Sequence, residues 1–313
     1  MNSRLILILP FLLSAFLSAL GATGALAQDK GTVDAKPLPP LANPKDPKLG
    51  AKELFARKLL PSAQPTKVIG SYTNGCLAGG EQMPLTGDTW QVMRLSRNRN
   101  WGHPKLVAFL ERLADKAKKV GWNGLLVGDM SQPRGGPMLT GHTSHQVGLD
   151  ADIWLTPMPD RKLSREEREF MSATMAVRDD RRDVDPNVWT HAHTELIRVA
   201  AEDPAVERIF VNAAIKKALC REAGSDRAWL AKVRPWHGHD YHFHIRIFCP
   251  PDSPQCEPQP PPESGEGCGH DLDPWFTEAM LRPPPPSTEP AKPKPGLTMA
   301  NLPPACRQVL MAP

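Results

Sequence analysis

Two clusters of histidine and aspartate, far apart in the chain, are the feature that most constrains how this protein folds. Residues 141–152 read GHTSHQVGLDAD, with six residues between His145 and Asp152, and residues 239–244 read HDYHFH. Imidazole nitrogen and carboxylate oxygen are ligands that zinc prefers. Burying such polar groups lowers the stability of the fold unless a hydrogen-bond partner or a metal ion satisfies them. The sequence therefore favours a fold that joins both clusters in one metal site over a purely structural cluster.

The residues around both clusters alternate as half-buried strands do. In residues 148–155, GLDADIWL, aspartates alternate with apolar residues, and in residues 241–248, YHFHIRIF, His242 and His244 share one face. If these strands are neighbours, one face carries Asp152 together with the two histidines. The loop before the first strand can then bring its own histidine over that face.

Other reactive patterns are absent or have a simpler explanation. His191 and His193 lie in WTHAHTELIRVAA, a pattern typical of a helix, where residues i and i+2 diverge, so we expect structural roles for them. The chain has no HExxH, SxxK, GxSxG, GxGxxG or GxxxxGK motif. These absences argue against zincins, serine acyl-enzymes and nucleotide binding. Metal-activated water is the remaining chemistry.

The N-terminus indicates export. Residues 1–27 contain Arg4, an apolar run and a final ALA before Gln28, as in a secretory signal peptide. No later stretch is long enough to span a bilayer, so we expect no stable membrane insertion after cleavage. An oxidising compartment favours three disulfides among six cysteines that lack CxxC spacing. Cys249 and Cys256 bracket a turn-rich loop and are the local pair that spacing favours, whereas sequence alone does not pair the others.

Beyond the expected signal peptide of residues 1–27, the composition divides the chain into three parts. Residues 28–70 are expected to be an extended lead-in, 71–250 a globular domain, and 251–313 a Pro-rich tail with little regular structure. The net charge of +4 is too small and dispersed to indicate nucleic-acid binding. Periodicity and capping patterns predict helices over 104–120, after Ser164 into EREFMSATMAV, over 190–201 and from Asn212 to near 224, with strands over 125–129 and 206–211.

Several stretches resemble the penicillin-insensitive murein endopeptidases, within the lysostaphin and D-Ala-D-Ala metallopeptidase group. They are SYTNGCLAGG, QVMR, WGHP, LVGDM, GHTSHQVGLDADIW, RIFVNAAIKKALC, DRAWLAKVRPW, YHFHIR and SGEGCG, and they are spread from Ser71 to the tail, over most of the mature chain. The resemblance implies an α+β fold with a central antiparallel sheet flanked by helices. It implies a Zn²⁺ enzyme that hydrolyses D-alanyl–meso-diaminopimelyl cross-links of periplasmic peptidoglycan and resists β-lactams.

The resemblance also implies roles for individual residues. A second zinc, which family members can hold through an Asp and a His, is not predicted here, because Asp179 is present but arginine stands where the histidine would be. The implied disulfides are Cys76–Cys306, Cys220–Cys268 and Cys249–Cys256. The implied metal ligands are His145, Asp152 and His244 with His142 as a further metal histidine, and the implied catalytic residues are His242 as base and His239.

Two alternative functions stay open at this point. The same zinc set suits a D,D-carboxypeptidase or dipeptidase that trims free D-Ala ends, which the choice between cross-linked and uncross-linked substrates would separate. A non-catalytic wall-binding module could keep zinc for structure only. The complete ligand set, with a further His242 beside it, favours an enzyme over such a module.

Overall fold

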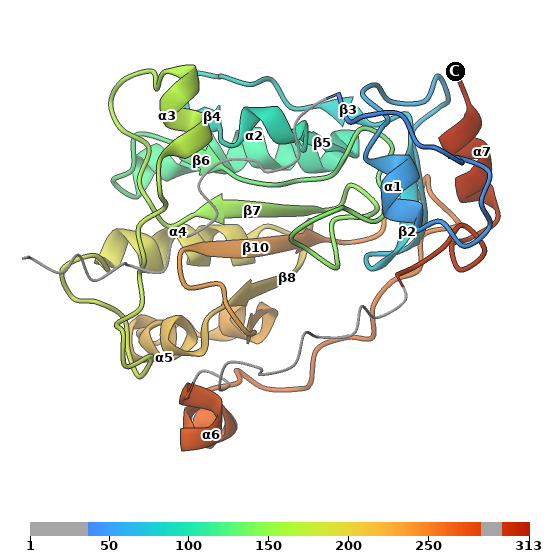
Figure 1. The fold of residues 1–313 in the computed structure, drawn as a ribbon. Coiled ribbons are helices and arrows are strands. Elements are labelled where there is room, and N and C mark those ends of the chain that lie inside the picture. The colour runs from blue at the N-terminus through green and yellow to red at the C-terminus, as the bar shows by residue number, and fades with distance from the viewer. Residues whose placement is uncertain (1–36, 283–295) are drawn as a thin grey trace, which may run out of the picture.

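The computed structural model describes residues 37–282 and 296–313, so the expected signal peptide lies outside the described residues (Figure 1). No helix in the described part is both long and apolar enough to cross a membrane. A six-stranded sheet in the order β4-β6-β7-β10-β8-β9 forms the centre of the molecule. Its strands are β4 Trp90–Val92, β6 Leu125–Val127, β7 Asp150–Trp154, β8 Val206–Val211, β9 Val233–Pro235 and β10 His242–Ile247.

The sheet is mixed rather than wholly antiparallel. The four central strands β6, β7, β10 and β8 pair antiparallel, as the expected central antiparallel sheet requires. The two edge strands differ, because β4 is parallel to β6 and β9 is parallel to β8. In each parallel pair a helix lies between the two strands in sequence, α2 (Pro104–Lys119) or α5 (Ala213–Glu222). A crossover through a helix returns the chain in the same direction, which gives parallel pairing.

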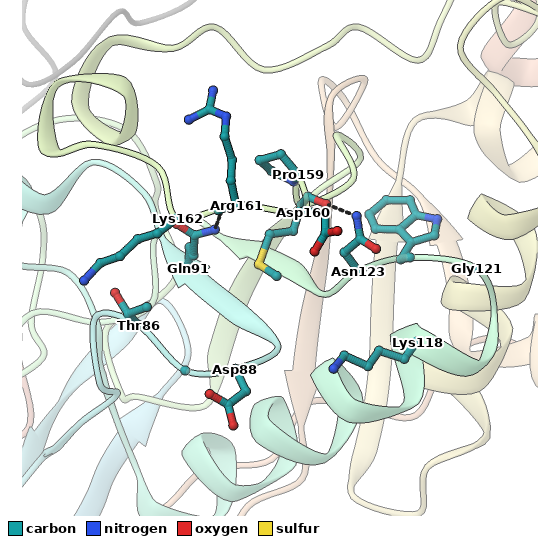
Figure 2. A pocket seen from close by; sticks show the side chains of 13 residues that line it. Thr86, Asp88, Gln91, Lys118, Gly121, Asn123, Pro159, Asp160, Arg161 and Lys162 are labelled. Carbon is teal, nitrogen blue, oxygen red and sulfur yellow. Dashed lines mark hydrogen bonds between the residues drawn. The ribbon is translucent and has the colours of Figure 1, made fainter.

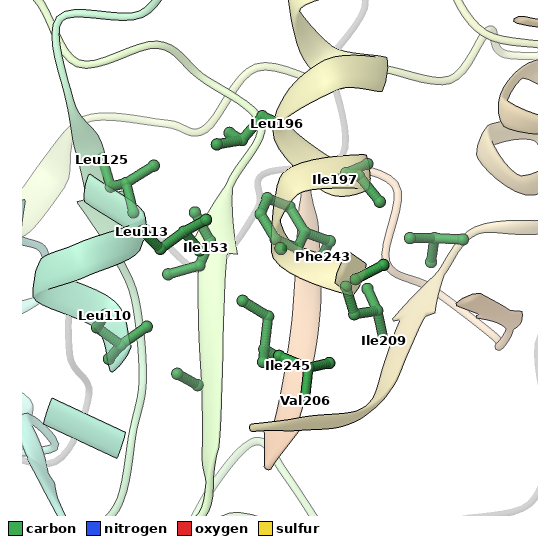
Figure 3. Packing of buried hydrophobic residues seen from close by; sticks show 14 of the residues in the cluster. Leu110, Leu113, Leu125, Ile153, Leu196, Ile197, Val206, Ile209, Phe243 and Ile245 are labelled. Carbon is green, nitrogen blue, oxygen red and sulfur yellow. The ribbon is translucent and has the colours of Figure 1, made fainter. Parts of the chain in front are cut away.

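Helices α2 and α4 (His191–Glu202) pack against one face of this sheet and form the main hydrophobic core with it (Figures 1 and 3). Ile153 of β7 and Phe243 and Ile245 of β10 point into this core and are fully buried. These are the strand positions that the alternation assigned to the apolar face. The opposite face of β7 and β10 is therefore left to their polar residues.

The predicted helices are mostly confirmed, and their caps are visible. His103 accepts a hydrogen bond from the backbone of Lys105 at the start of α2, and Asn212 caps α5. The capping box at Ser164 is also present, but helix α3 (Arg165–Phe170) is shorter than predicted. Beyond it the backbone N–H of Ala176 bonds to the carbonyl of Asp240, so this segment is tied to the loop before β10 instead of continuing the helix.

A second, smaller core joins the two ends of the described chain. Helix α1 (Ala51–Phe55) and the C-terminal helix α7 (Ala305–Met311) pack beside the hairpin of β1 (Lys67–Ser71) and β2 (Asn74–Ala78). Regular structure was not expected in the lead-in or the tail. Phe55 and Leu310 are buried here, and this burial stabilises helices too short to form alone.

The remaining elements are short. Three disulfides, Cys76–Cys306, Cys220–Cys268 and Cys249–Cys256, fasten the tail to the body, and these are the pairs that the resemblance implies. A small two-stranded antiparallel sheet and short helical turns complete the described chain: β3 Glu81–Gln82, β5 Trp101–Gly102, α6 Glu278–Leu281, and 3₁₀ turns at Leu95–Arg97, Ala228–Lys232 and Gly269–Phe276.

Candidate metal centre and active site

Strands β7 and β10 are direct antiparallel neighbours, which meets the condition that the sequence interpretation set for a shared face. Their register places His244 opposite Asp152 and Arg246 opposite Asp150. Residues directly opposite one another in a sheet point to the same face. The aspartates and the H-x-H pair therefore share one face, on the side away from the α2 and α4 core.

The loop of residues 141–148 brings two further histidines over this face. Its backbone turns sharply, with positive φ at His145 (65°) and at Gly148 (71°). A side chain at Gly148 would collide with Leu77 and approach the backbone of Gly102, so only glycine fits this close approach. The backbone N–H of His145 donates to the Oδ2 of Asp150 at 3.1 Å, which holds the turn against β7.

Four imidazoles converge on the carboxylate of Asp152. Its Oδ1 lies 3.2 Å from the Nδ1 of His244, 3.4 Å from the Nε2 of His145 and 3.6 Å from the Nε2 of His242. Its Oδ2 lies 3.2 Å from the Nε2 of His142. Burial alone would raise the pKa of the Asp152 carboxyl, but His142 and the other imidazoles hold it well below its usual range. Asp152 is thus an anionic centre surrounded by potential ligands.

The unsatisfied atoms at this centre fit a metal ion. Both ring nitrogens of His145, both of His242 and the Oδ1 of Asp152 are buried without a hydrogen-bond partner. Buried polar atoms are rarely left so unless an ion or water completes them. In the described part of the chain, the group of side chains able to hold a metal is His142, His145 and Asp152, whose ligand atoms lie within 4.8 Å of one another.

Two carboxylates behind the centre orient its imidazoles. Asp150 accepts from the Nε2 of His244 at 2.9 Å and from the Nε of Arg246 at 2.7 Å. Asp129 lies 3.3 Å from the Nε2 of His142. The sequence interpretation left the role of Asp150 open between an orienting partner and a solvent-facing residue. The structure supports the former, because Asp150 is fully buried.

Asp129 was not predicted as a site residue. It receives hydrogen bonds from Arg99 at 2.9 Å and from Arg97 at 3.1 Å. Burial alone would raise its pKa, but the charge of Arg99 and the hydrogen bond with His142 lower it. A carboxylate at the end of the buried strand predicted over 125–129 is the sequence signal that could have indicated it.

Comparison with known proteins places this site in a family. The model of the family described as penicillin-insensitive murein endopeptidase matches residues 68–311. A curated protein of that name from Haemophilus influenzae is 47% identical over 247 residues, which cover 78% of this chain and 82% of the relative. One from Klebsiella pneumoniae is 44% identical over 250 residues, 80% of this chain and 88% of the relative.

The chain belongs to the penicillin-insensitive murein endopeptidase family. The family match begins at β1 and ends within α7, so it contains every candidate site residue and all six cysteines. The resemblance seen in the sequence motifs is thereby confirmed.

In this penicillin-insensitive murein endopeptidase chain the two histidines predicted to be catalytic lie beside the metal group. The rings of His239 and His242 are 4.8 Å apart between centroids. Burial lowers the pKa of His242 to about 3 and that of His239 to about 4. Both imidazoles are therefore neutral near pH 7. For His244, burial alone would lower the pKa, but the charge and hydrogen bond of Asp150 outweigh it, so the pKa of His244 is raised.

Other candidates do not join the site. His193 is buried in α4, where its Nε2 contacts the carbonyl of Leu155 at 2.9 Å, and His191 is exposed, as their structural interpretation expects. Asp179 is exposed and is not part of any metal-binding group found in the described ranges. A separate cavity of about 550 Å³ lies near Asp88 and Arg161 and contains no histidine (Figure 2). Its lining offers no metal-ligand set comparable with the histidine cluster.

Two hollows border the metal group, His142, His145 and Asp152, in this family member. The smaller, about 130 Å³, is lined by Asp152, His242 and Tyr241. The larger, about 440 Å³, is lined by His239, His244 and residues of β8 and its neighbours. His142 lines both. Both hollows therefore adjoin the histidine cluster.

Proposed function

We propose that this protein is a periplasmic, zinc-dependent murein D,D-endopeptidase that hydrolyses D-alanyl–meso-diaminopimelyl cross-links and is insensitive to β-lactams. The observation that carries the proposal is the group of buried, unpartnered nitrogen and oxygen atoms around Asp152. It occurs in a chain whose curated relatives are named penicillin-insensitive murein endopeptidases. The proposal includes a D-Ala-D-Ala metallopeptidase-like fold, supported by the Asp and H-x-H pair on adjacent antiparallel strands.

In this proposal the zinc is held by His145, Asp152 and His244, with His142 as a further metal histidine. The donor set of imidazole nitrogen and carboxylate oxygen is one that zinc accepts in catalytic sites. A zinc ion held by these residues would supply Lewis acidity, lowering the pKa of a water molecule to about 7 and polarising the scissile carbonyl. The hydrogen bond from His244 to Asp150 fixes the ring so that its Nδ1 faces Asp152.

The proton is handled by His242. Its Nε2 lies 3.6 Å from Asp152, beside the proposed zinc ligands, and we assign it to accept the proton of the attacking water and return it to the leaving amine. His239 lies beside it and lines the larger hollow, and we assign it as the second catalytic histidine. No serine is acylated in this scheme, which is the reason to expect insensitivity to β-lactams.

Export to the periplasm rests on the signal-peptide pattern of residues 1–27 and on the six cysteines, all of which are paired. Fractionation of cells that express the full chain tests it directly. The mature protein should leave with the periplasmic fraction, and its N-terminal sequence should begin near Gln28. Recovery of the uncleaved chain in the cytoplasm contradicts this part of the proposal.

Digestion of purified sacculi tests the activity. Mature protein is incubated with sacculi in the presence of a β-lactam, and the muropeptides are separated and identified by mass spectrometry. Cross-linked dimers should fall while monomers rise in proportion. A chelator should stop the reaction, and added zinc should restore it.

The same digest separates the alternatives. Loss of terminal D-alanine from uncross-linked stems, with dimers unchanged, would identify a carboxypeptidase. No change in any muropeptide, together with binding to sacculi, would identify a wall-binding module. Activity that persists in the metal-free protein would contradict the proposed chemistry.

A further inference from the structure

The larger hollow, beside His244, is lined by positively charged side chains and by no carboxylate. It is lined by Arg208, Phe210 and Trp236 in addition to the histidines, and none of its lining residues is an aspartate or glutamate. A hollow with cations and no carboxylate attracts an anionic group. It adjoins the histidine cluster directly, so its ligand is a part of whatever molecule reaches the metal group.

The strand register fixes the sheet face and the position from which the Arg208 side chain projects. In the pairing of β10 with β8, Phe210 is opposite His244, and Arg208 is opposite Arg246. Arg208 is therefore on the same face as the metal group and two residues further along the strand, or roughly 7 Å. A side chain as long as arginine can cover that distance toward the centre.

The two opposed arginines differ in their partners. Arg246 is neutralised by Asp150 at 2.7 Å. Arg208 donates to the carbonyl of Pro260 at 2.7 Å, and its Nε is buried without a hydrogen-bond partner. In the described part of the chain, Arg208 forms no ion pair with a carboxylate. Of the two opposed arginines, Arg208 is thus the one whose charge no carboxylate of the described chain pairs with.

The Pro-rich tail and the aromatic side chains fix the position of Arg208. The carbonyl of Pro260, which accepts from its guanidinium, belongs to the tail, and the guanidinium carbon lies 5.9 Å from the ring centroid of Phe210. Trp236, 54% exposed, packs edge-on against Phe210 at 5.8 Å. The tail therefore contributes one wall of this hollow, and the exposed indole offers an apolar surface beside the cation.

We propose that Arg208 binds the carboxylate on the carbon that carries the leaving amine, and so selects the diaminopimelyl arm of the cross-link. This inference rests on the proposed function. In that cross-link the scissile nitrogen and a free carboxylate share one carbon of diaminopimelate, so a cation that recognises the arm lies close to the metal group. A planar guanidinium can bind a carboxylate through two parallel hydrogen bonds.

A pair of substrates tests the inference. One is a cross-linked muropeptide dimer with the free carboxylate, and the other is the same dimer amidated at that carboxyl group. Hydrogen bonds to charged groups are strong enough that the wild-type KM should be about 10-fold or more higher for the amidated dimer. Arg208→Gln should raise KM for the free dimer by a similar factor, with kcat nearly unchanged, and should no longer distinguish the two dimers.

Two further variants sharpen the result. Arg208→Lys keeps the positive charge but lacks the two parallel N–H donors of a guanidinium. It should retain part of the discrimination between the free and the amidated dimer. Arg307→Gln is the control. It removes an exposed arginine of α7, a helix that contributes no residue to the candidate site, and should behave as wild type. Calorimetric binding of the monomeric product gives a readout independent of turnover, and Arg208→Gln should weaken it by a similar factor.

Two results would overturn the inference. One is a wild-type protein that cleaves both dimers with equal KM, which decides the matter even if Arg208→Gln does not fold. The other is a folded Arg208→Gln variant that still discriminates between the dimers. A wild-type protein that cleaves neither dimer contradicts the proposed function itself, and with it this inference.

Discussion

Asp150 accepts a hydrogen bond from the Nε2 of His244 at 2.9 Å, and this leaves the Nδ1 of the same ring 3.2 Å from the carboxylate of Asp152. The same aspartate binds Arg246 and the backbone of His145. One buried carboxylate thus positions an imidazole from β10 and the turn that carries another. Outer partners of this kind set the tautomer and orientation of metal-binding histidines.

Asp150→Asn should weaken zinc binding although Asp150 is not a proposed ligand. Replacement of such an outer partner typically costs about 10–100-fold in metal affinity. It also leaves the buried Arg246 without its counter-ion, which should lower the thermal stability. Competition with a chromophoric chelator measures the affinity, and calorimetry measures unfolding. Asp180→Asn, at an exposed position, is the control, and an unchanged zinc affinity in Asp150→Asn would contradict the orienting role.

His244→Ala and His242→Ala should differ in metal content although the residues are two apart on one strand face. The first removes a proposed ligand, so zinc occupancy and turnover should both fall. The second removes the proposed base, so zinc should stay while kcat falls by about 10²–10⁴-fold, as is typical of general acid–base catalysis. Elemental analysis of purified protein is compared with cleavage of cross-linked muropeptides.

The exposed His191 supplies the control for this pair, since His191→Ala should change neither zinc nor turnover. Both site variants should fold, because Phe243 and Ile245 on the core face are untouched. Zinc retained in His244→Ala and lost in His242→Ala would reverse the assignment. Normal cleavage by both variants would contradict the mechanism.

Removal of the three disulfides one at a time should destabilise the protein to different extents. In the chain-entropy model, a bond that closes a longer loop restricts the unfolded chain more. Cys76–Cys306 spans 230 residues, and its double serine variant should lose about 2–5 kcal/mol. Cys249–Cys256 spans 7 residues and should matter least. Urea unfolding of each variant tests the order, and equal losses would contradict it. The wild-type protein should contain no titratable thiol.

Stability should depend on pH through Lys216. This lysine is fully buried in α5 and donates to the carbonyls of Leu230 and Glu266, and burial lowers its pKa to about 7. Because the ordinary pKa is 10.5, the unfolded chain holds more protons than the folded chain between pH 7 and 10.5. The free energy of unfolding therefore gains a contribution that rises with pH across this window and is absent below pH 7.

Lys216→Met should remove that contribution. The difference in unfolding free energy between the wild-type protein and the variant, measured from pH 6 to pH 10, isolates Lys216 from other titrating groups. This difference should increase with pH in favour of the wild-type protein. A difference that does not vary with pH would contradict the lowered pKa.

Much of the site could be predicted from local patterns. The alternation of residues 148–155 and 241–248 gave the correct faces, because side chains on a strand alternate whatever the strand pairs with. The caps at Ser164 and Asn212 marked helix starts correctly. The end of α3 was missed because it depends on a hydrogen bond from Ala176 to Asp240, which is far away in the sequence.

The sequence by itself determined the ligand types, the polar face of each strand and the family motifs, since these depend on residue identity and short spacing. Only the tertiary structure decided that β7 and β10 are neighbours, that Asp150 and Asp129 stand behind the imidazoles, and that Arg208 lies on the same face. The physical reason is that strand order and register follow from burial of the whole core. A residue's partners across a sheet are therefore not encoded in its own segment.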